Sequence, residues 1–168
     1  LYSTKIDNNC KIMCVEPNKG MLSVGKKKLK NMNNIIWHQS PAEELPFKDN
    51  TFDFYTISFG IRNVTNINKS LQEAFRVLKT GGRFFCLEFS KVENEILYEL
   101  YNQYSKIIPT IGKYFAGDEM AYNYLVDSIK SFYNQADLKD IIEKNSFKDV
   151  EFRNLSGGIS AIHTGWKL

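Results

Sequence analysis

The sequence of 168 residues lacks several features that would assign it to a broad class of protein. It has no apolar run approaching the ~20 residues that cross a bilayer, which argues against a membrane-spanning protein. Its three cysteines are an odd number, so a disulfide framework is not expected. Cys10 and Cys14 have neither a second cysteine pair nor a histidine pair beside them, and we therefore expect no metal site.

Basic residues form only one dense cluster along the chain. The net charge is +3, and the dense cluster consists of Lys26, Lys27, Lys28 and Lys30. Nucleic-acid-binding domains typically have a pI above ~9 and a basic face interleaved with aromatic residues. Here the lysines follow a helical pattern with apolar residues on the other side, which we interpret as a solvated helix face. No nucleic-acid partner is expected.

The chain does contain a regular alternation of strand and helix patterns. The expected strands are residues 11–16, 34–39, 52–59, 83–89, 150–155 and 159–166. The expected helices are residues 18–30, 66–78, 94–108, 120–132 and 135–145. This alternation predicts a single α/β domain over residues 1–168 with a doubly wound, mostly parallel sheet. Gly157 and Gly158 between the last two strands predict a terminal antiparallel hairpin.

Residues 51–90 form the most informative stretch, because they are read as strand, polar turn, helix, Gly-Gly corner and strand. Open α/β sheets bind ligands at the carboxyl ends of their parallel strands. The polar turn there carries Ser58, Arg62 and Asn63, and we expect a site at this turn. The chain has no G-x-G-x-x-G motif, so a nicotinamide dinucleotide is not the expected ligand.

Six segments carry a resemblance to a known family. They are GML at 20–22, AEELPFKDNTFD at 42–53, ISFGIRNV at 57–64, FRVLKTGGRFFCLEFSK at 75–91, YLVDSI at 124–129 and GGISAIHTGWKL at 157–168. On these segments the chain resembles the ubiquinone/menaquinone biosynthesis C-methyltransferase family, whose members are Rossmann-like class I S-adenosylmethionine-dependent methyltransferases. FGxRNV followed by LEFSK is the most specific part of the match. CLEFSK and the AIHxGxKL ending look more like the mitochondrial coenzyme Q branch than the bacterial one.

The resemblance implies transfer of a methyl group from S-adenosylmethionine to a ring carbon of a polyprenyl benzoquinol. It also implies a place on the matrix face of the mitochondrial inner membrane, with a peripheral membrane contact, a quinone-biosynthesis complex and a homodimer as further expectations. A bacterial cytoplasmic location remains the alternative. Other open alternatives are a menaquinone-type or other small-molecule methyltransferase, and a non-catalytic subunit of a quinone-biosynthesis complex.

The resemblance implies four residues that contact the cofactor. Glu16 would accept hydrogen bonds from the ribose hydroxyls, and otherwise it is a carboxylate favoured by the following helix N-terminus. Pro41 and Ala42 fall where the family contacts the adenine, although Pro41 offers no N–H and is otherwise an ordinary loop proline. Ser58 would contact the cofactor, or its hydroxyl would cap loose backbone groups at the strand end.

Arg62 and Asn63 are the catalytic residues that the resemblance implies. A guanidinium has a pKa above ~12 and is a poor base. We therefore expect Arg62 to stabilise a substrate phenolate, or to polarise a water that acts as base. Asn63 would orient the ring hydroxyl or that water. The structural alternative is an arginine that ties the turn to a carboxylate.

Two further expectations concern the cover and the front of the site. A helical segment of about residues 94–132 would cover the substrate, and its aromatic residues would line a prenyl channel or belong to the core: Tyr114, Phe115, Tyr122 and Tyr124.

The family carries a glycine-rich loop after its first strand, whereas no glycine precedes Lys11. We expect that strand and loop to be missing, which would leave unpaired edges on the neighbouring strands.

Overall fold

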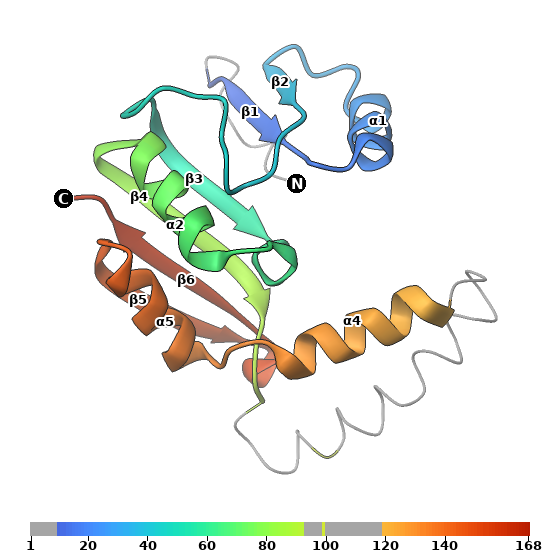
Figure 1. Cartoon of the computed structure of the whole chain (residues 1–168), viewed down its shortest axis with the longest axis vertical. Helices are drawn as coiled ribbons and strands as arrows, with labels where there is room; N and C mark the ends of the chain where they lie inside the picture. The colour runs from blue at the N-terminus through green and yellow to red at the C-terminus, as the bar shows by residue number, and fades with distance from the viewer. Residues whose placement is uncertain (1–9, 93–98, 100–118) are drawn as a thin grey trace.

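The computed structural model describes residues 10–92, 99 and 119–168, which form an α/β arrangement (Figure 1). The strands are β1 (Ile12–Val15), β2 (Ile35–His38), β3 (Phe52–Ser58), β4 (Leu78–Phe89), β5 (Lys148–Leu155) and β6 (Ser160–Trp166). The helices are α1 (Lys19–Lys28), α2 (Ile67–Val77), α4 (Glu119–Ser131) and α5 (Gln135–Lys144), with 3-10 turns η1 (Ile61–Asn63) and η2 (Ser156–Gly158). No helix in this described part is both long and apolar enough to span a membrane.

The strands form two sheets. β1 and β2 pair in parallel, and the larger sheet has the order β3-β4-β6-β5. In it β3 and β4 are parallel, whereas β6 is antiparallel to both β4 and β5. The parallel units and the terminal antiparallel hairpin are thus confirmed. The single expected sheet is instead split, because within the described residues no strand pairs with both β1 and β3.

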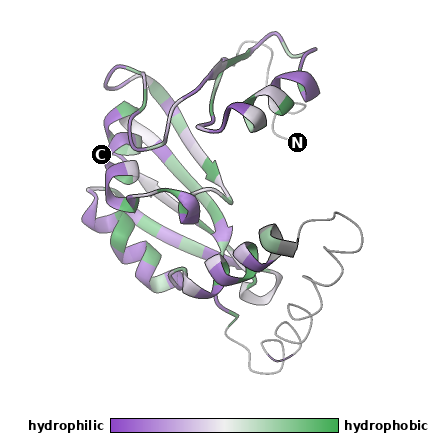
Figure 2. Ribbon diagram, turned by 45° about the vertical axis from the view of Figure 1, so that its right-hand side comes forward, coloured by the Kyte–Doolittle hydropathy of each residue, from purple (hydrophilic) through white to green (hydrophobic). Residues whose placement is uncertain are grey.

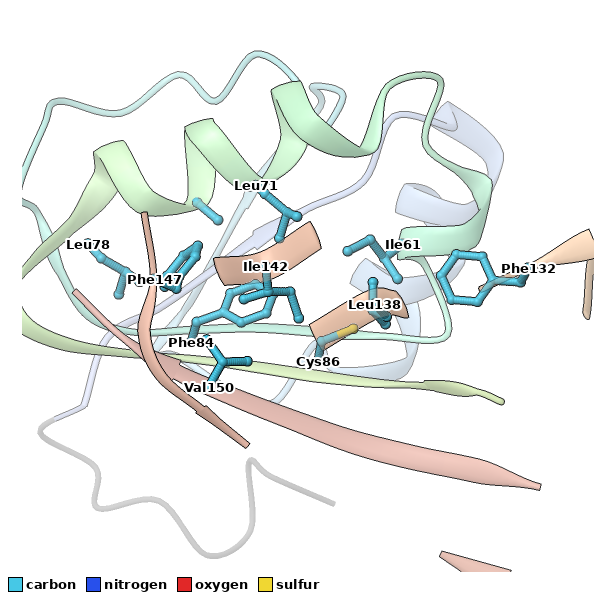
Figure 3. Close-up of a cluster of buried hydrophobic side chains, with 11 residues drawn as sticks. Ile61, Leu71, Leu78, Phe84, Cys86, Phe132, Leu138, Ile142, Phe147 and Val150 are labelled. Carbon is cyan, nitrogen blue, oxygen red and sulfur yellow. The ribbon is translucent and has the colours of Figure 1, made fainter. Parts of the chain in front are cut away.

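The main hydrophobic core lies between the larger sheet and helices α2 and α5 (Figure 3). Phe84 and Cys86 of β4 are fully buried and share one cluster with Leu71 of α2 and Ile142 of α5. Burying a large apolar side chain stabilises a fold by roughly 1.5–3 kcal/mol. This core therefore fixes β4 firmly beneath the turn that precedes α2.

The opposite face of the larger sheet is less covered. Phe54 on β3 is 63% exposed, and its face neighbours Thr56 and Ser58 are also exposed. The alternation of hydrophobic and hydrophilic residues along these strands is visible in Figure 2. The described helices α2 and α5 both pack on the other side of this sheet. Of the helical cover expected on both faces, the described residues therefore show the cover of one face.

The connection between β2 and β3 is tied to α2. Glu43 Oε1 accepts hydrogen bonds from the backbone N–H groups of Thr65 and Asn66, at 2.6 and 3.1 Å. A carboxylate at a helix N-terminus is favoured by the exposed N–H groups and the helix dipole. At the other end of α2, Arg76 donates to the carbonyls of Leu45 and Phe47. Pro41 and Ala42 therefore lie in a loop held at both ends of one helix.

Candidate functional site

The candidate site begins where β3 ends. Ser58 pairs with Leu87 of β4, and the Phe59 N–H donates to the Leu87 carbonyl at 2.8 Å. Phe59 has a φ of 53°, a left-handed conformation that non-glycine residues seldom adopt. The chain then turns through Gly60 into η1, which carries Arg62 and Asn63. The carboxyl ends of two parallel strands and a polar turn thus meet at one edge of the sheet.

Arg62 is held on three sides. Its Nη1 donates to Glu88 Oε1 at 2.7 Å and to the Phe59 carbonyl at 2.9 Å. Its Nε donates to the hydroxyl of Ser128, on α4, at 3.3 Å. The Arg62 side chain is only 7% exposed. Within the described residues its other amino nitrogen, Nη2, has no hydrogen-bond partner.

Glu88 is the second charge of the site, and the sequence did not single it out. Its side chain is 1% exposed, and it also accepts the backbone N–H groups of Phe89 and Arg62, at 2.8 and 3.4 Å. A buried carboxylate is destabilising by several kcal/mol unless it is paired. The signal was present, because an acid inside the apolar run FFCLEF is rarely buried without a partner.

The Arg62–Glu88 pair realises the structural alternative, an arginine that ties the turn to a carboxylate. It leaves the catalytic interpretation open, since Nη2 is not part of that tie. One aromatic ring lies against the guanidinium, and a second ring packs on the first. The guanidinium Cζ lies 5.2 Å from the centre of the Phe89 ring, which in turn lies 4.8 Å from the Phe59 ring. An aromatic, partly dry setting of this kind suits a flat aromatic ligand.

Asn63 is contacted by the helix that the sequence assigned to the cover. The Tyr124 hydroxyl on α4 donates to Asn63 Oδ1 at 3.1 Å, although Tyr124 is 60% exposed. The amide oxygen is thereby engaged, and the amide nitrogen is the group left for a ligand. Tyr124 thus lies at the turn and outside the core. Tyr114 and Phe115 lie outside the described residues, as does the side chain of Tyr122.

Glu16 and the Pro41–Ala42 loop lie at the carboxyl ends of β1 and β2. Glu16 Oε1 accepts the Asn18 N–H at 2.9 Å, so the helix-start role is real. Within the described residues Glu16 Oε2 and the Ala42 N–H have no hydrogen-bond partner. The Gln39 side chain donates to the Pro17 carbonyl at 3.3 Å and joins the two strand ends. Pro41 contributes only its carbonyl, which accepts the Glu44 N–H at 3.3 Å.

Ser58 is exposed at the end of β3, and its hydroxyl has no partner in the described part of the chain. The site therefore has two halves: Ser58 with Arg62 and Asn63 on one side, and Glu16 with Ala42 on the other. Glu43 connects them, because it follows Ala42 and binds the backbone just after η1. The second half thus offers a carboxylate oxygen and a backbone N–H, and the first half offers a hydroxyl beside the guanidinium.

The fold defines the class of the protein. A S-adenosylmethionine-dependent methyltransferase from Aquifex aeolicus has a TM-score of 0.71 at 15% identity, covering 99% of this chain and 73% of that one. A S-adenosylmethionine-dependent methyltransferase from Thermotoga maritima has a TM-score of 0.67 at 21% identity, covering 94% and 73%. The chain thus has the fold of class I S-adenosylmethionine-dependent methyltransferases.

Within that class, the chain belongs to the ubiE/COQ5 methyltransferase family, whose model matches residues 2–167. It is 52% identical over 161 residues to the mitochondrial 2-methoxy-6-polyprenyl-1,4-benzoquinol methylase of Bos taurus, covering 94% of this chain and 49% of that protein. It is 50% identical to the ubiquinone/menaquinone biosynthesis C-methyltransferase UbiE of Brucella canis, covering 94% and 60%. The chain thus spans about half the length of these relatives. Membership confirms the predicted family and implies S-adenosylmethionine as methyl donor.

Proposed function

We propose that the protein transfers a methyl group from S-adenosylmethionine to a ring carbon of a polyprenyl benzoquinol in ubiquinone biosynthesis. The observation that carries this proposal is the Arg62 guanidinium, which is held at the carboxyl end of β3 with Nη2 unengaged among the described residues. The names of the relatives support this acceptor, since one is a benzoquinol methylase and the other a methyltransferase of ubiquinone/menaquinone biosynthesis.

S-adenosylmethionine supplies a methyl group on a positively charged sulfur. In this proposal Glu16 accepts hydrogen bonds from the ribose hydroxyls, and the Ala42 N–H donates to the adenine. Ser58 contacts the cofactor through its hydroxyl. Pro41 shapes the loop that presents Ala42. The unengaged Glu16 Oε2, Ala42 N–H and Ser58 hydroxyl support these roles, because each atom is available to a ligand within the described part of the protein.

On the acceptor side, Arg62 stabilises negative charge on a ring oxygen as the phenol passes its proton to a water molecule. That charge makes the neighbouring ring carbon a stronger nucleophile. The carbon forms a bond to the methyl group, the electrons of the broken bond stay on sulfur, and the ring carbon then loses its proton to water. Asn63 donates from its amide nitrogen to the ring hydroxyl, since Tyr124 already binds the amide oxygen.

The same proposal includes the surroundings of the protein. In the expected covering segment of about residues 94–132, α4 is the described helix, and we infer that it covers the acceptor. The contacts of Ser128 and Tyr124 with the turn support this role, whereas residues 94–98 and 100–118 lie outside the described residues. We place the protein on the matrix face of the mitochondrial inner membrane, in peripheral contact with it, within a quinone-biosynthesis complex and as a homodimer. The mitochondrial relatives support a mitochondrial location, and the bacterial relatives are equally compatible with the bacterial alternative.

Methylation of a defined acceptor by the full-length protein tests the proposal. S-adenosylmethionine with a ¹³C-labelled methyl group would be incubated with a reduced 2-methoxy-6-prenyl-1,4-benzoquinol of short chain. We expect the label on a ring carbon by NMR and saturable cofactor binding by calorimetry. Label on a ring oxygen would contradict C-methylation, and no detectable cofactor binding would favour the non-catalytic alternative. Transfer to a demethylmenaquinol alone would replace the proposed acceptor.

A further inference from the structure

We propose that Glu88 is a positioning residue, which fixes the Arg62 guanidinium so that Nη2 is the group that meets the acceptor oxygen. This inference rests on the proposed function. It adds a residue that the cofactor and catalytic roles above do not include. It also assigns the contact with substrate to one nitrogen of Arg62.

The position of Glu88 is set by the most rigid part of the fold. It lies on β4, which is paired on one side with β3 and on the other with β6. Glu88 itself faces Ala161 of β6, and both residues are almost completely buried. Its neighbours on the same face of the strand, Phe84 and Cys86, belong to the hydrophobic core (Figure 3). The carboxylate therefore cannot move far from its place.

Both oxygens of that carboxylate are directed at the turn. Oε1 binds the Arg62 side chain at 2.7 Å, and Oε2 accepts the backbone N–H of the same residue at 3.4 Å. Glu88 thus holds both the charge and the backbone of η1. An ion pair buried as deeply as this adds little stability compared with apolar side chains of similar volume. A requirement for a fixed cation at the turn explains why a charged pair stands here.

The remaining donors of Arg62 define its direction. Phe59 and Ser128 engage the other Nη1 hydrogen and Nε, and the Phe89 ring lies against the guanidinium. A planar guanidinium fixed at Nη1 and Nε can point only Nη2 away from these partners. Misplacing a catalytic group by about 1 Å can lower a rate about 100-fold. Loss of Glu88 should therefore reduce turnover more than binding.

The first test uses Glu88→Gln and Glu88→Asp in the full-length protein. Glu88→Gln keeps the shape but loses the charge, and we expect kcat to fall about 10- to 100-fold. The cofactor Kd and the acceptor KM should stay within about threefold, since neither ligand contacts Glu88. Glu88→Asp keeps the charge on a shorter side chain and should recover part of kcat. A kcat equal to wild type in Glu88→Gln, with only a lower Tm, would overturn the inference.

A double-mutant cycle with Arg62→Met separates positioning from an independent role. If Glu88 acts through Arg62, Glu88→Gln should lower kcat no further in the Arg62→Met background. The double variant should also have a higher Tm than Arg62→Met alone, because the single change leaves a buried carboxylate unpaired. Equal fold losses in both backgrounds would mean that Glu88 acts by itself and would overturn the inference.

A third measurement needs no substrate. The Nε–H signal of Arg62, identified in a ¹⁵N NMR spectrum by its loss in Arg62→Lys, should exchange slowly with water in the wild type. It should exchange at least about 10-fold faster in Glu88→Gln. Unchanged exchange would overturn the inference, whatever the activity. A wild-type protein that binds cofactor but methylates no quinol would instead overturn the proposed function.

Discussion

Two arginines stand near opposite ends of α2, and both bind carboxylates. Arg76 donates all five of its N–H groups: to Glu73 through Nε and Nη2, to Asp49 and the Phe47 carbonyl through Nη1, and to the Leu45 carbonyl through Nη2. Arg62 donates three, and Nη2 has no partner among the described residues. Arg62 is also the more buried of the two, at 7% against 31% exposed.

The two arginines differ in what their guanidinium groups leave available to a ligand. A guanidinium whose donors are all engaged closes a loop and has nothing left for a ligand. The Arg76 guanidinium accordingly lowers the pKa of Glu73, which is a contribution to stability. A guanidinium that is buried, paired and still has a free amino nitrogen is placed for binding. The two residues should therefore differ in what their loss removes.

The largest expected effect is on turnover, when Arg62 is replaced. Arg62→Met should lower kcat by about 100-fold or more, because one charge-stabilising group is lost. The cofactor Kd should change by less than about twofold, since the proposed cofactor contacts lie elsewhere. Steady-state kinetics and calorimetry on folded protein measure both. Equal losses of kcat and cofactor affinity would place Arg62 among the structural residues with Arg76.

The matched change at the other arginine should spare turnover. Arg76→Met should lower stability by about 1–2 kcal/mol, because two carboxylates and two carbonyls lose their donor in a partly exposed network. The loop with Ala42 should loosen, which would weaken cofactor affinity several-fold while kcat at saturation stays near wild type. Thermal unfolding and cofactor titration report these changes. A large loss of kcat at saturation would contradict a purely structural role of Arg76.

A smaller effect is expected at the contact between α4 and the turn. Tyr124→Phe removes only the hydroxyl that donates to Asn63, and the side chain is 60% exposed. We expect kcat to fall about 3- to 10-fold, the size of one lost hydrogen bond, with Tm unchanged. Tyr133→Phe, on an exposed residue outside the site, serves as control. An unchanged kcat in Tyr124→Phe would remove Tyr124 from the site.

The smallest expected effect is at His163, which lies outside the site. One of its ring nitrogens has no hydrogen-bond partner among the described residues, but it is buried away from solvent. His163 is 1% exposed and its Nε2 binds the Gln135 carbonyl, whereas its buried Nδ1 has no partner among the described residues. Burial lowers the pKa of His163 below its ordinary 6.5. The unfolded chain therefore binds the proton first, and stability should fall by about 1 kcal/mol per pH unit below that value.

His163→Gln should abolish this pH dependence of unfolding and leave kcat unchanged. Denaturant unfolding between mildly acidic and neutral pH measures the slope in both proteins. An identical slope in wild type and variant would assign the dependence to other groups. An unpartnered nitrogen therefore marks a site only where a ligand can also reach it.

Much of this fold could be predicted from sequence, because buried strands are continuous apolar runs. The site at the turn after β3 could be located because parallel strands place their carboxyl ends at the same edge of a sheet. Glu88 was missed as a site residue because its role depends on the register of β3 and β4, which brings it under η1. Tyr124 was assigned only to a channel or the core, because its bond to Asn63 depends on how α4 packs. The division into two sheets likewise depends on tertiary pairing.

The place of β6 has a consequence for how the protein is made. Phe89 of β4 pairs with Ser160 of β6, so the strand that carries Glu88 cannot complete its hydrogen bonds until distant residues have left the ribosome. Such long-range pairing is slow to form, and an incomplete sheet offers an open edge to other chains. One edge of β4 therefore stays unpaired until β6 docks. Only then is the charged pair beneath the turn sealed from water.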